Sequence, residues 1–297
     1  MRYTIALDDT IWPQDYVDMT YFALSRDGST TAAAVQIKEA GSGEVHKFQE
    51  GIFSAALNGQ AWENTFLNVW NLAISPDNGH LAAEVRLNLY DYTIAMDGDI
   101  WPQTYNCVWA PCFHPISNSV VAPVRSQGKW TMVRDGTRIW DRTFDQVWQQ
   151  FFSRDGNHLA AIVAPHYGRW TMAVDGNPWK TTFGDMVIDP VFSPTGADLA
   201  ALAKDKGGWT VVVNGRPWQK VFERAWPPVF SPDGTLVAAK VEYRGGFTIA
   251  VNDCLWDMSC EQVWEPIFSP DGKRLLIRSM REGKYYRQVI PVTGIVK

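Results

Sequence analysis

Residues 148–183 read WQQFFSRDGNHLAAIVAPHYGRWTMAVDGNPWKTTF. Two short apolar runs, WQQFFS and HLAAIVA, are separated by the turn RDGN. The next run, RWTMAVD, alternates apolar and polar residues as a strand does. The Asp-Gly pair after it is a strong signal of a two-residue β-hairpin, because both turn positions need a positive φ. With NPWKTTF closing the stretch, we predict four short strands, A to D, joined by tight turns.

The same unit recurs along the whole chain, and two independent sets of residues mark it. The tryptophan after the Asn-Gly or Asp-Gly pair recurs, mostly at 39-residue steps, as Trp12, Trp62, Trp101, Trp140, Trp179, Trp218 and Trp256. The turn that resembles Ser-Pro-Asp-Gly recurs seven times as well, beginning at residues 25, 75, 114, 153, 193, 231 and 269. The first step is longer because the connector 38–50 carries an insertion.

Seven units of four strands, each of about 39 residues, predict an all-β fold: a seven-bladed β-propeller with four-stranded antiparallel blades. Period-2 alternation, hairpin turns and prolines argue against helical repeats. We treat residues 1–297 as a single propeller domain whose ring is closed by N-terminal and C-terminal strands. The chain offers one C-type strand too many for this closure, because residues 3–8 and 285–292 both fit the same place.

Composition and charge narrow the classes of function. The chain has 15 Trp, 14 Phe and 10 Tyr, a net charge of −5 and no basic run, so we expect no nucleic-acid partner. No stretch has the roughly 18 apolar residues of a spanning helix, and the N-terminus lacks a signal-peptide core. We therefore expect a cytoplasmic protein without direct membrane insertion.

The sequence carries no recognisable catalytic or metal-binding motif. GxSxG, HExxH, P-loop and GxGxxG motifs are missing. The four cysteines form no CxxC or CxxCH, and the five histidines lack metal-ligand spacing. Acidic residues concentrate in the turns, where Asp accepts local backbone hydrogen bonds. We expect no enzymatic activity, no catalytic residues, no metal and no cofactor.

Each unit has up to four aromatic places. The first lies on strand C, the second is the tryptophan described above, and the third follows four residues later. Because these places are filled in nearly every unit, they are expected to pack the blades together. Cys260 takes the third place in the last unit and is expected to be a buried filler. The fourth place holds Trp70, Trp109, Trp148, Trp226 and Trp264, with Thr20 and Val187 in the other two units.

Two interpretations of the fourth place are open. We expect it where strand D crosses to the next strand A, at the rim of one face. The tryptophans there either pack at blade edges or bind a protein partner, because Trp is enriched in interface hot spots. The connector 38–50 is expected on the same face, as a recognition loop or as a solvated excursion. The candidate partner-binding rim consists of Trp70, Trp109, Trp148, Trp226, Trp264, His46 and Phe48. An alternative function is a small-ligand or carbohydrate-binding propeller that uses an aromatic channel mouth.

The blocks FSPDGTLVAA (230–239) and FSPTGADLAA (192–201) resemble WD40-like and TolB-type propeller repeats, and the likeness covers essentially the whole chain. The Gly-His pair of true WD40 repeats does not recur from unit to unit, so the hydrogen-bond tetrad of that family is not expected. The Trp-rich repeats also resemble the tryptophan-rich subunit of the Tmc transmembrane redox complex of sulfate-reducing bacteria. That resemblance implies a scaffold without cofactors whose protein partners are redox-complex subunits, and which is membrane-associated through them.

Overall fold

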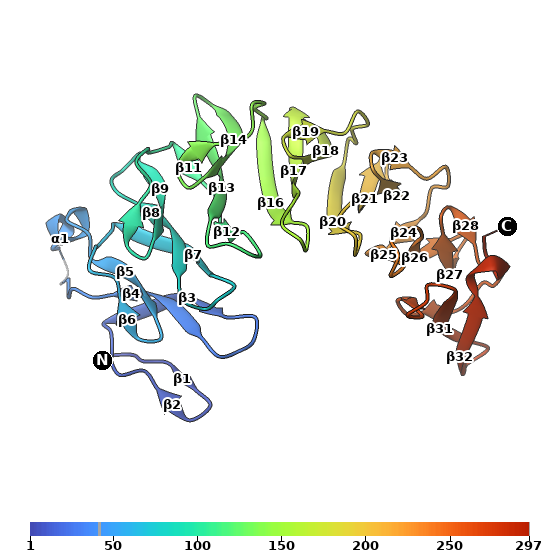
Figure 1. The fold of residues 1–297 in the computed structure, drawn as a ribbon, viewed down its shortest axis with the longest axis horizontal. Coiled ribbons are helices and arrows are strands. Elements are labelled where there is room, and N and C mark those ends of the chain that lie inside the picture. The colour runs from blue at the N-terminus through green and yellow to red at the C-terminus, as the bar shows by residue number, and fades with distance from the viewer. Residues whose placement is uncertain (41–42, 297) are drawn as a thin grey trace. The chain divides into compact units, whose positions relative to one another are not determined.

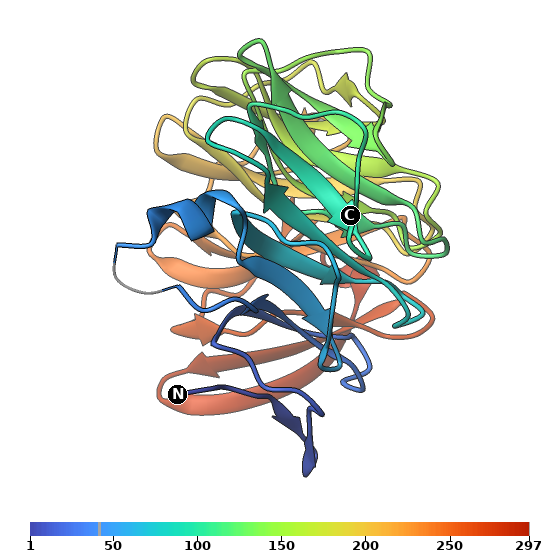
Figure 2. The same cartoon turned by 90° about the vertical axis from the view of Figure 1, so that its left-hand side faces the viewer.

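The computed structural model describes residues 1–40 and 43–296, and most of these residues lie in β-strands and the turns between them (Figure 1). The chain divides into two compact units, Met1–Phe151 and Phe152–Lys297, and the division falls inside strand β16 (Gln146–Phe152). Helical segments in the described ranges are α1 (Val45–Gln49), the coiled ribbon in blue in Figure 2, and η1 (Val292–Gly294). Neither segment is long enough to cross a membrane.

The first unit contains a hairpin and three larger antiparallel sheets. The hairpin is β1 (Ala6–Leu7) and β2 (Thr10–Ile11). The next two sheets are β3 (Asp18–Leu24), β4 (Thr31–Gln36), β5 (Phe53–Leu57) and β6 (Gln60–Ala61), then β7 (Asn68–Ile74), β8 (Leu81–Arg86), β9 (Tyr92–Met96) and β10 (Asp99–Ile100). In the third sheet, β11 (Cys107–Val108) and β12 (Cys112–Phe113) both pair with β13 (Val120–Ser126), which is followed by β14 (Lys129–Arg134) and β15 (Thr137–Arg138).

The second unit repeats this arrangement. After β16 come β17 (Leu159–His166), β18 (Arg169–Val174) and β19 (Asn177–Pro178), then β20 (Met186–Phe192), β21 (Leu199–Asp205), β22 (Gly208–Val213) and β23 (Arg216–Pro217). In the next sheet, β24 (Arg224–Ala225) and β25 (Val229–Phe230) pair with β26 (Val237–Tyr243), followed by β27 (Gly246–Val251) and β28 (Cys254–Leu255). In the last, β29 (Gln262–Val263) and β30 (Ile267–Phe268) pair with β31 (Arg274–Arg281), which pairs with β32 (Lys284–Pro291).

The strands of six of the larger sheets follow one another in the order A, B, C, D, as the repeat predicts, and the last sheet consists of two strand A segments, B and C. The structure therefore confirms the all-β class and the four-stranded antiparallel unit, while the closed seven-bladed ring stays a prediction. Of the two competing C-type segments, β32 pairs with β31 and takes the C place of the last sheet. The other, residues 3–8, lies in the β1–β2 hairpin.

The C–D turn shows why Asn or Asp recurs before glycine. In Asn214-Gly215 both residues have positive φ, 50° and 76°. The Asn214 side-chain oxygen also accepts the N–H of Leu199, the first residue of strand B, at 2.9 Å. The same contact, at 2.8–3.0 Å, joins Asn58 to Thr31, Asp97 to Leu81, Asp135 to Val120, Asp175 to Leu159 and Asn252 to Val237. Each turn thus tolerates the left-handed backbone and also fixes the start of strand B.

The A–B turn confirms the expected role of its acidic residue. Ser231 Oγ donates to Asp233 at 2.5 Å and accepts the N–H of Leu236 at 2.9 Å. In an equivalent turn, hydrogen bonds from Ser75 and then Asn118 lower the pKa of Asp77 to about 2. These aspartates are turn-forming groups that stay ionised.

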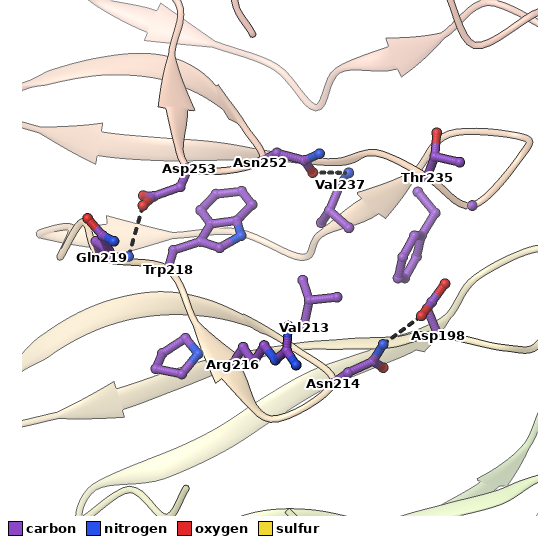
Figure 3. A pocket seen from close by; sticks show the side chains of 13 residues that line it. Asp198, Val213, Asn214, Arg216, Trp218, Gln219, Thr235, Val237, Asn252 and Asp253 are labelled. Carbon is purple, nitrogen blue, oxygen red and sulfur yellow. Dashed lines mark hydrogen bonds between the residues drawn. The ribbon is translucent and has the colours of Figure 1, made fainter. Parts of the chain in front are cut away.

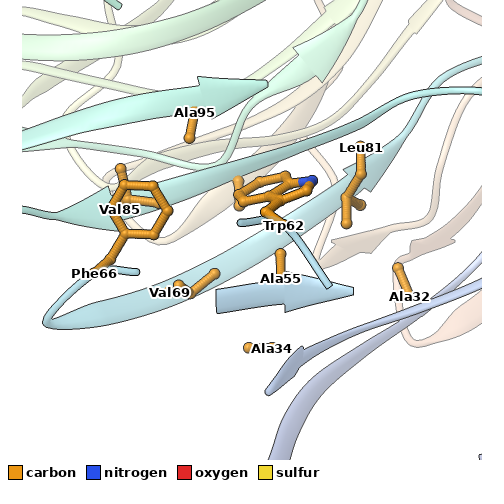
Figure 4. Packing of buried hydrophobic residues seen from close by; sticks show 10 residues of the cluster. Ala32, Ala34, Ala55, Trp62, Phe66, Val69, Leu81, Val85 and Ala95 are labelled. Atoms are coloured by element: carbon orange, nitrogen blue, oxygen red, sulfur yellow. The ribbon is translucent and has the colours of Figure 1, made fainter. Parts of the chain in front are cut away.

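The hydrophobic core lies between neighbouring sheets. Trp62 and Phe66, which follow β6, pack on Val69, Leu81 and Val85 of the next sheet (Figure 4). Strand B contributes small residues to these contacts, because it is covered on both faces. In every unit the backbone of the first-place residue forms an isolated antiparallel β-bridge with the backbone of the third-place residue. The pairs are Tyr3–Tyr16, Phe53–Phe66, Tyr92–Tyr105, Trp130–Phe144, Trp170–Phe183, Trp209–Phe222 and Phe247–Cys260.

The second-place tryptophan packs against the glycine of the next C–D turn. A Cβ added at Gly215 would lie 2.9 Å from Cγ of Trp179, and one at Gly98 would lie 3.2 Å from Cβ of Trp62. Glycine is therefore needed for its backbone conformation and for the close approach of the indole ring. Each of these contacts links a sheet to the one before it.

We expect Gly215→Ala to lower the free energy of unfolding by about 3 kcal/mol, because it combines backbone strain with a clash against Trp179. Gly245→Ala is the matched control, since Gly245 has a φ of 75° but nothing within 4 Å of an added Cβ. The control should cost only about 1 kcal/mol. Urea unfolding measures both values, and equal losses would show that the tryptophan contact contributes nothing.

Candidate functional site

The fourth aromatic place lies within the ladder between strands A and B, so the predicted location in the D-to-A crossing is wrong. Trp70 is part of β7 and pairs with Glu84. In three other sheets the tryptophan follows a short first segment of strand A, and its backbone N–H donates to a backbone carbonyl of strand B. These bonds run from Trp109 to Pro123 (2.9 Å), from Trp226 to Lys240 (3.0 Å) and from Trp264 to Arg278 (3.1 Å). The ladder continues through this place because strand A begins before it.

Each of these indole rings packs on an aromatic residue of strand C. The ring centroids are 6.2 Å apart in Trp70–Tyr92, 5.2 Å in Trp109–Trp130, 5.8 Å in Trp226–Phe247 and 5.6 Å in Trp264–Tyr285. The Trp109 and Trp130 rings are nearly parallel, with 1° between their planes. The sequence analysis gives the first and fourth places separate roles. In the structure the two side chains pack on each other across strand B and form one aromatic pair.

Strand A is irregular directly after the fourth place. The ladder of β7 shifts register after Trp70, and Asn71 has a φ of 49°. This is a β-bulge, which bends the strand and changes the direction of its side chains. In other sheets a proline interrupts the strand instead, at Pro111, Pro228 and Pro266.

The position of the bulge shows that the sequence alignment of the unit containing β20 is off by one residue at the fourth place. In β20 the positive φ falls on Asp189, and Ile188 pairs with Leu202 as Trp70 pairs with Glu84. Ile188 is therefore the counterpart of the tryptophans, and the predicted counterpart Val187 is a buried residue that pairs with Ala203. The sequence spacing is misleading because this unit has one extra residue between Phe183 and the bulge.

Trp109, at 39%, and Trp148, at 40%, are the most exposed of the five rim tryptophans, and Trp70, Trp226 and Trp264 are more buried. The side chain of Gln150 donates to the carbonyl of Ala110 at 2.5 Å, and this bond connects the strand A segments that carry the two exposed rings. Trp109 and Trp148 thus lie on linked segments of the first unit.

The inserted connector contains the one-turn helix α1 rather than an irregular loop. His46 lies in α1 and its side chain is exposed, while the side chain of Phe48 lies outside the described residues. Lys47 pairs with Glu44 at 2.8 Å. The connector leaves β4 at the B–C end of its sheet, which is the end that carries the fourth place. His46 therefore lies at the corresponding end of a different sheet from the tryptophans.

Buried charged residues beneath the rim were missed by the sequence analysis. Glu84 is only 7% exposed and accepts a hydrogen bond from Asn71 at 2.8 Å. Burial raises the pKa of Glu84 to about 7. In the second unit, the Lys240 ammonium lies 4.3 Å from the ring centre of Trp226, and burial lowers the pKa of Lys240. In the sequence, these two residues could have been recognised as the one charged residue within the otherwise apolar strand B blocks LAAEV and VAAKV.

Cys260 is buried, as expected for a filler of the third place, and burial raises the pKa of its thiol. All four cysteines are free thiols. Across residues 1–40 and 43–296, no cluster of three or more His, Cys, Asp or Glu residues has an arrangement that could hold a metal ion.

A groove of about 820 Å³ lies in the second unit, between the sheets that contain β22 and β27 (Figure 3). Trp218, Arg216 and Asp198 line it, but none of the rim tryptophans does. At the turn beside it, Asp253 takes the place of glycine with a φ of 68°, and its carboxylate accepts the N–H groups of Gln219 and Lys220. Trp218 is half-buried, as is Trp179, which packs on Gly215.

No family model matches the sequence, and no curated protein matches it either. Among solved structures, the chain is similar to a eukaryotic initiation factor, with 11% identity, coverage of 92% of this chain and 80% of that one, and a TM-score of 0.48. It is also similar to the propeller domain of Myceliophteria thermophila Cps50 (Swd1), with 12% identity, 92% and 98% coverage and a TM-score of 0.38. For TolB from Acinetobacter baumannii the identity is 14%, the coverage 75% and 60%, and the TM-score 0.34.

The pKa of Glu84 makes stability depend on pH. Because its pKa is raised above the ordinary value of 4.5, the folded state binds the proton more strongly than the unfolded chain does. The wild-type protein should therefore lose roughly 2–3 kcal/mol of stability between pH 4.5 and pH 7–8. Glu84→Gln should remove most of this loss, because the amide cannot ionise. Urea unfolding of both proteins at pH 5 and pH 8 measures it, and an identical pH dependence would contradict the assignment.

Proposed function

We propose that the chain is a non-catalytic scaffold for protein–protein interactions, built as a seven-bladed propeller whose ring is closed by terminal strands. The observation that carries this proposal is the exposed pair Trp109 and Trp148 on linked strand A segments. Exposed tryptophans fixed on a sheet are typical of interface hot spots. The expected partner surface is an apolar patch that excludes water from both rings.

The rigidity of Trp109 favours binding. Its ring is already stacked on Trp130, and its backbone is held by the carbonyl of Pro123. A partner therefore has little side-chain motion to freeze when it binds, which lowers the entropy cost of association. The half-buried Trp70, Trp226 and Trp264 are assigned to packing within their own sheets.

For the partner, we propose subunits of a membrane-associated electron-transfer complex, with this chain as a cytoplasmic accessory subunit that holds no redox centre itself. The support is the resemblance of the Trp-rich repeats to the tryptophan-rich subunit of the Tmc complex. Redox genes beside the gene for this chain, and haem absorbance in the fraction that copurifies with it, are the observations expected from this assignment.

A small ligand or carbohydrate is the second candidate, bound in the groove beside Trp218. The half-buried indole and the neighbouring Arg216 and Asp198 offer a stacking surface and polar partners. A specific ligand should raise the Tm by mass action. A thermal-shift screen with sugars, repeated on Trp218→Ala, separates this candidate from the scaffold.

The double variant Trp109→Ala, Trp148→Ala should bind the copurified partner at least about 30-fold more weakly, because hot-spot truncations cost about 2 kcal/mol or more. Biolayer interferometry with the purified partner measures the Kd. Ile116→Ala is the control, since Ile116 is 73% exposed and lies in the A–B turn between β12 and β13, at the opposite end of its sheet from the fourth place. Unchanged affinity of the double variant rules out the rim as the interface, and its unfolding would assign both tryptophans to the core.

A further inference from the structure

The groove beside Trp218 lies between two sheets of the second unit, and its lining departs from the repeat at two places. The first place is the residue before strand B, whose carbonyl accepts the N–H of the residue that opens the A–B turn. Along the chain this place is occupied by Thr30, His80, Ser119, His158, Asp198, Leu236 and Arg274. Of these seven residues, only Asp198 carries a carboxylate. The second place is the C–D turn position where Asp253 replaces glycine, and both aspartates line this one groove (Figure 3).

The groove has a fixed aromatic surface. Trp218 lines it, and the backbone N–H of Trp218 donates to the carbonyl of Val211 at 2.8 Å. The indole meets the buried ring of Phe222 edge-on, with the ring centroids 6.3 Å apart and 80° between the ring planes. Val213 and Pro217 add apolar surface beside it. A ligand ring can therefore pack on an indole that is already held in place.

The unpaired charge in the groove is positive. Asp198 accepts the side-chain amide of Asn214 at 2.5 Å, and Asp253 accepts two backbone N–H groups and lies 3.8 Å from the Lys220 ammonium. Among the described residues that line the groove, Arg216 is the charged side chain that has neither a hydrogen bond nor an ion pair. Because a guanidinium binds a carboxylate through two parallel hydrogen bonds, Arg216 favours a ligand that carries a carboxylate.

The other free polar groups of the groove suit hydroxyls. Within the part of the chain that the structure describes, one carboxylate oxygen of Asp198 accepts no hydrogen bond. The side-chain oxygen of Asn252 accepts the N–H of Val237 at 2.9 Å, while its amide N–H groups donate to no described residue. A hydroxyl both donates and accepts, so it can bond to either of these groups. The volume of about 820 Å³ lies in the range of small-molecule sites.

We propose that this groove binds a hexuronic acid, a sugar ring that carries a carboxylate. The ring packs on Trp218, the carboxylate pairs with Arg216, and ring hydroxyls bond to Asp198 and Asn252. Binding of this kind rests on the second candidate function above, whose ligand class it narrows. A neutral sugar lacks the group that pairs with Arg216, and a simple aromatic acid lacks the hydroxyls.

Isothermal titration calorimetry of the full chain tests the ligand class with four sugars: glucuronate, galacturonate and their neutral parents glucose and galactose. At least one uronate should bind about tenfold more tightly than its neutral parent, because a charge-assisted bidentate pair is stronger than a neutral hydrogen bond. Benzoate has a ring and a carboxylate but no hydroxyls, and should bind more weakly than that uronate.

Variants of Arg216 test the contact with the carboxylate. Arg216→Gln should remove the preference, so that the uronate binds no more tightly than its neutral parent. Arg216→Lys should keep part of the preference, because it retains the charge but loses the bidentate geometry. Arg154→Gln is the matched control, since Arg154 is an exposed arginine of the second unit in the A–B turn between β16 and β17 and does not line the groove. Its preference should equal that of the wild type.

Each contrary result has a distinct meaning. Equal affinity for a uronate and its neutral parent overturns the hexuronic acid but leaves the carbohydrate candidate intact. Failure of all four sugars to bind overturns both. Benzoate that binds as tightly as the uronate shows that the hydroxyls contribute nothing and overturns the ligand class. A preference that survives in Arg216→Gln places the carboxylate outside this groove and overturns the assignment.

Discussion

The hydrogen bond from the first N–H of strand B to the side chain of the C–D turn is the contact on which six of the larger sheets depend. It joins the start of strand B to a turn about 15 residues later, as between Val237 and Asn252. The turn residue must tolerate a positive φ and must also carry a side-chain oxygen, and only Asn and Asp do both readily. This double requirement explains why these two residues recur at the C–D turns.

The packing between sheets follows from the same turn. Its second residue lies against the tryptophan of the preceding sheet, so glycine there brings the two sheets close, as Gly215 does with Trp179. Small residues on strand B then fit between the sheets. Where Asp253 replaces glycine, its carboxylate instead accepts the N–H groups of Gln219 and Lys220 in the preceding sheet. The residue at this turn position therefore decides which kind of contact joins two sheets.

At the rim tryptophans, regular side-chain packing across the sheet occurs beside irregular pairing of strand A. The left-handed residues after Trp70 and Trp148, and the prolines after Trp109, Trp226 and Trp264, interrupt regular pairing there. The rings of Trp70, Trp109, Trp226 and Trp264 pack across strand B on an aromatic residue of strand C. Beneath the rim, the strand B residue opposite the tryptophan is ionisable in three sheets, as Glu84, Lys240 and Arg278, so the surroundings of the tryptophans differ from sheet to sheet. The rim is thus a set of similar positions with different electrostatics.

The sequence by itself determined the strands, the turns and the first three aromatic places, because alternation, positive-φ residues and close packing act over a few residues. Only the tertiary structure decided that Trp109 stacks on Trp130, that Ile188 rather than Val187 is the counterpart of the rim tryptophans, and that Glu84 is buried. Those facts depend on ladder register and on which face of a strand is covered. One extra residue, as before Asp189, changes both without altering the repeat that a reader of the sequence sees.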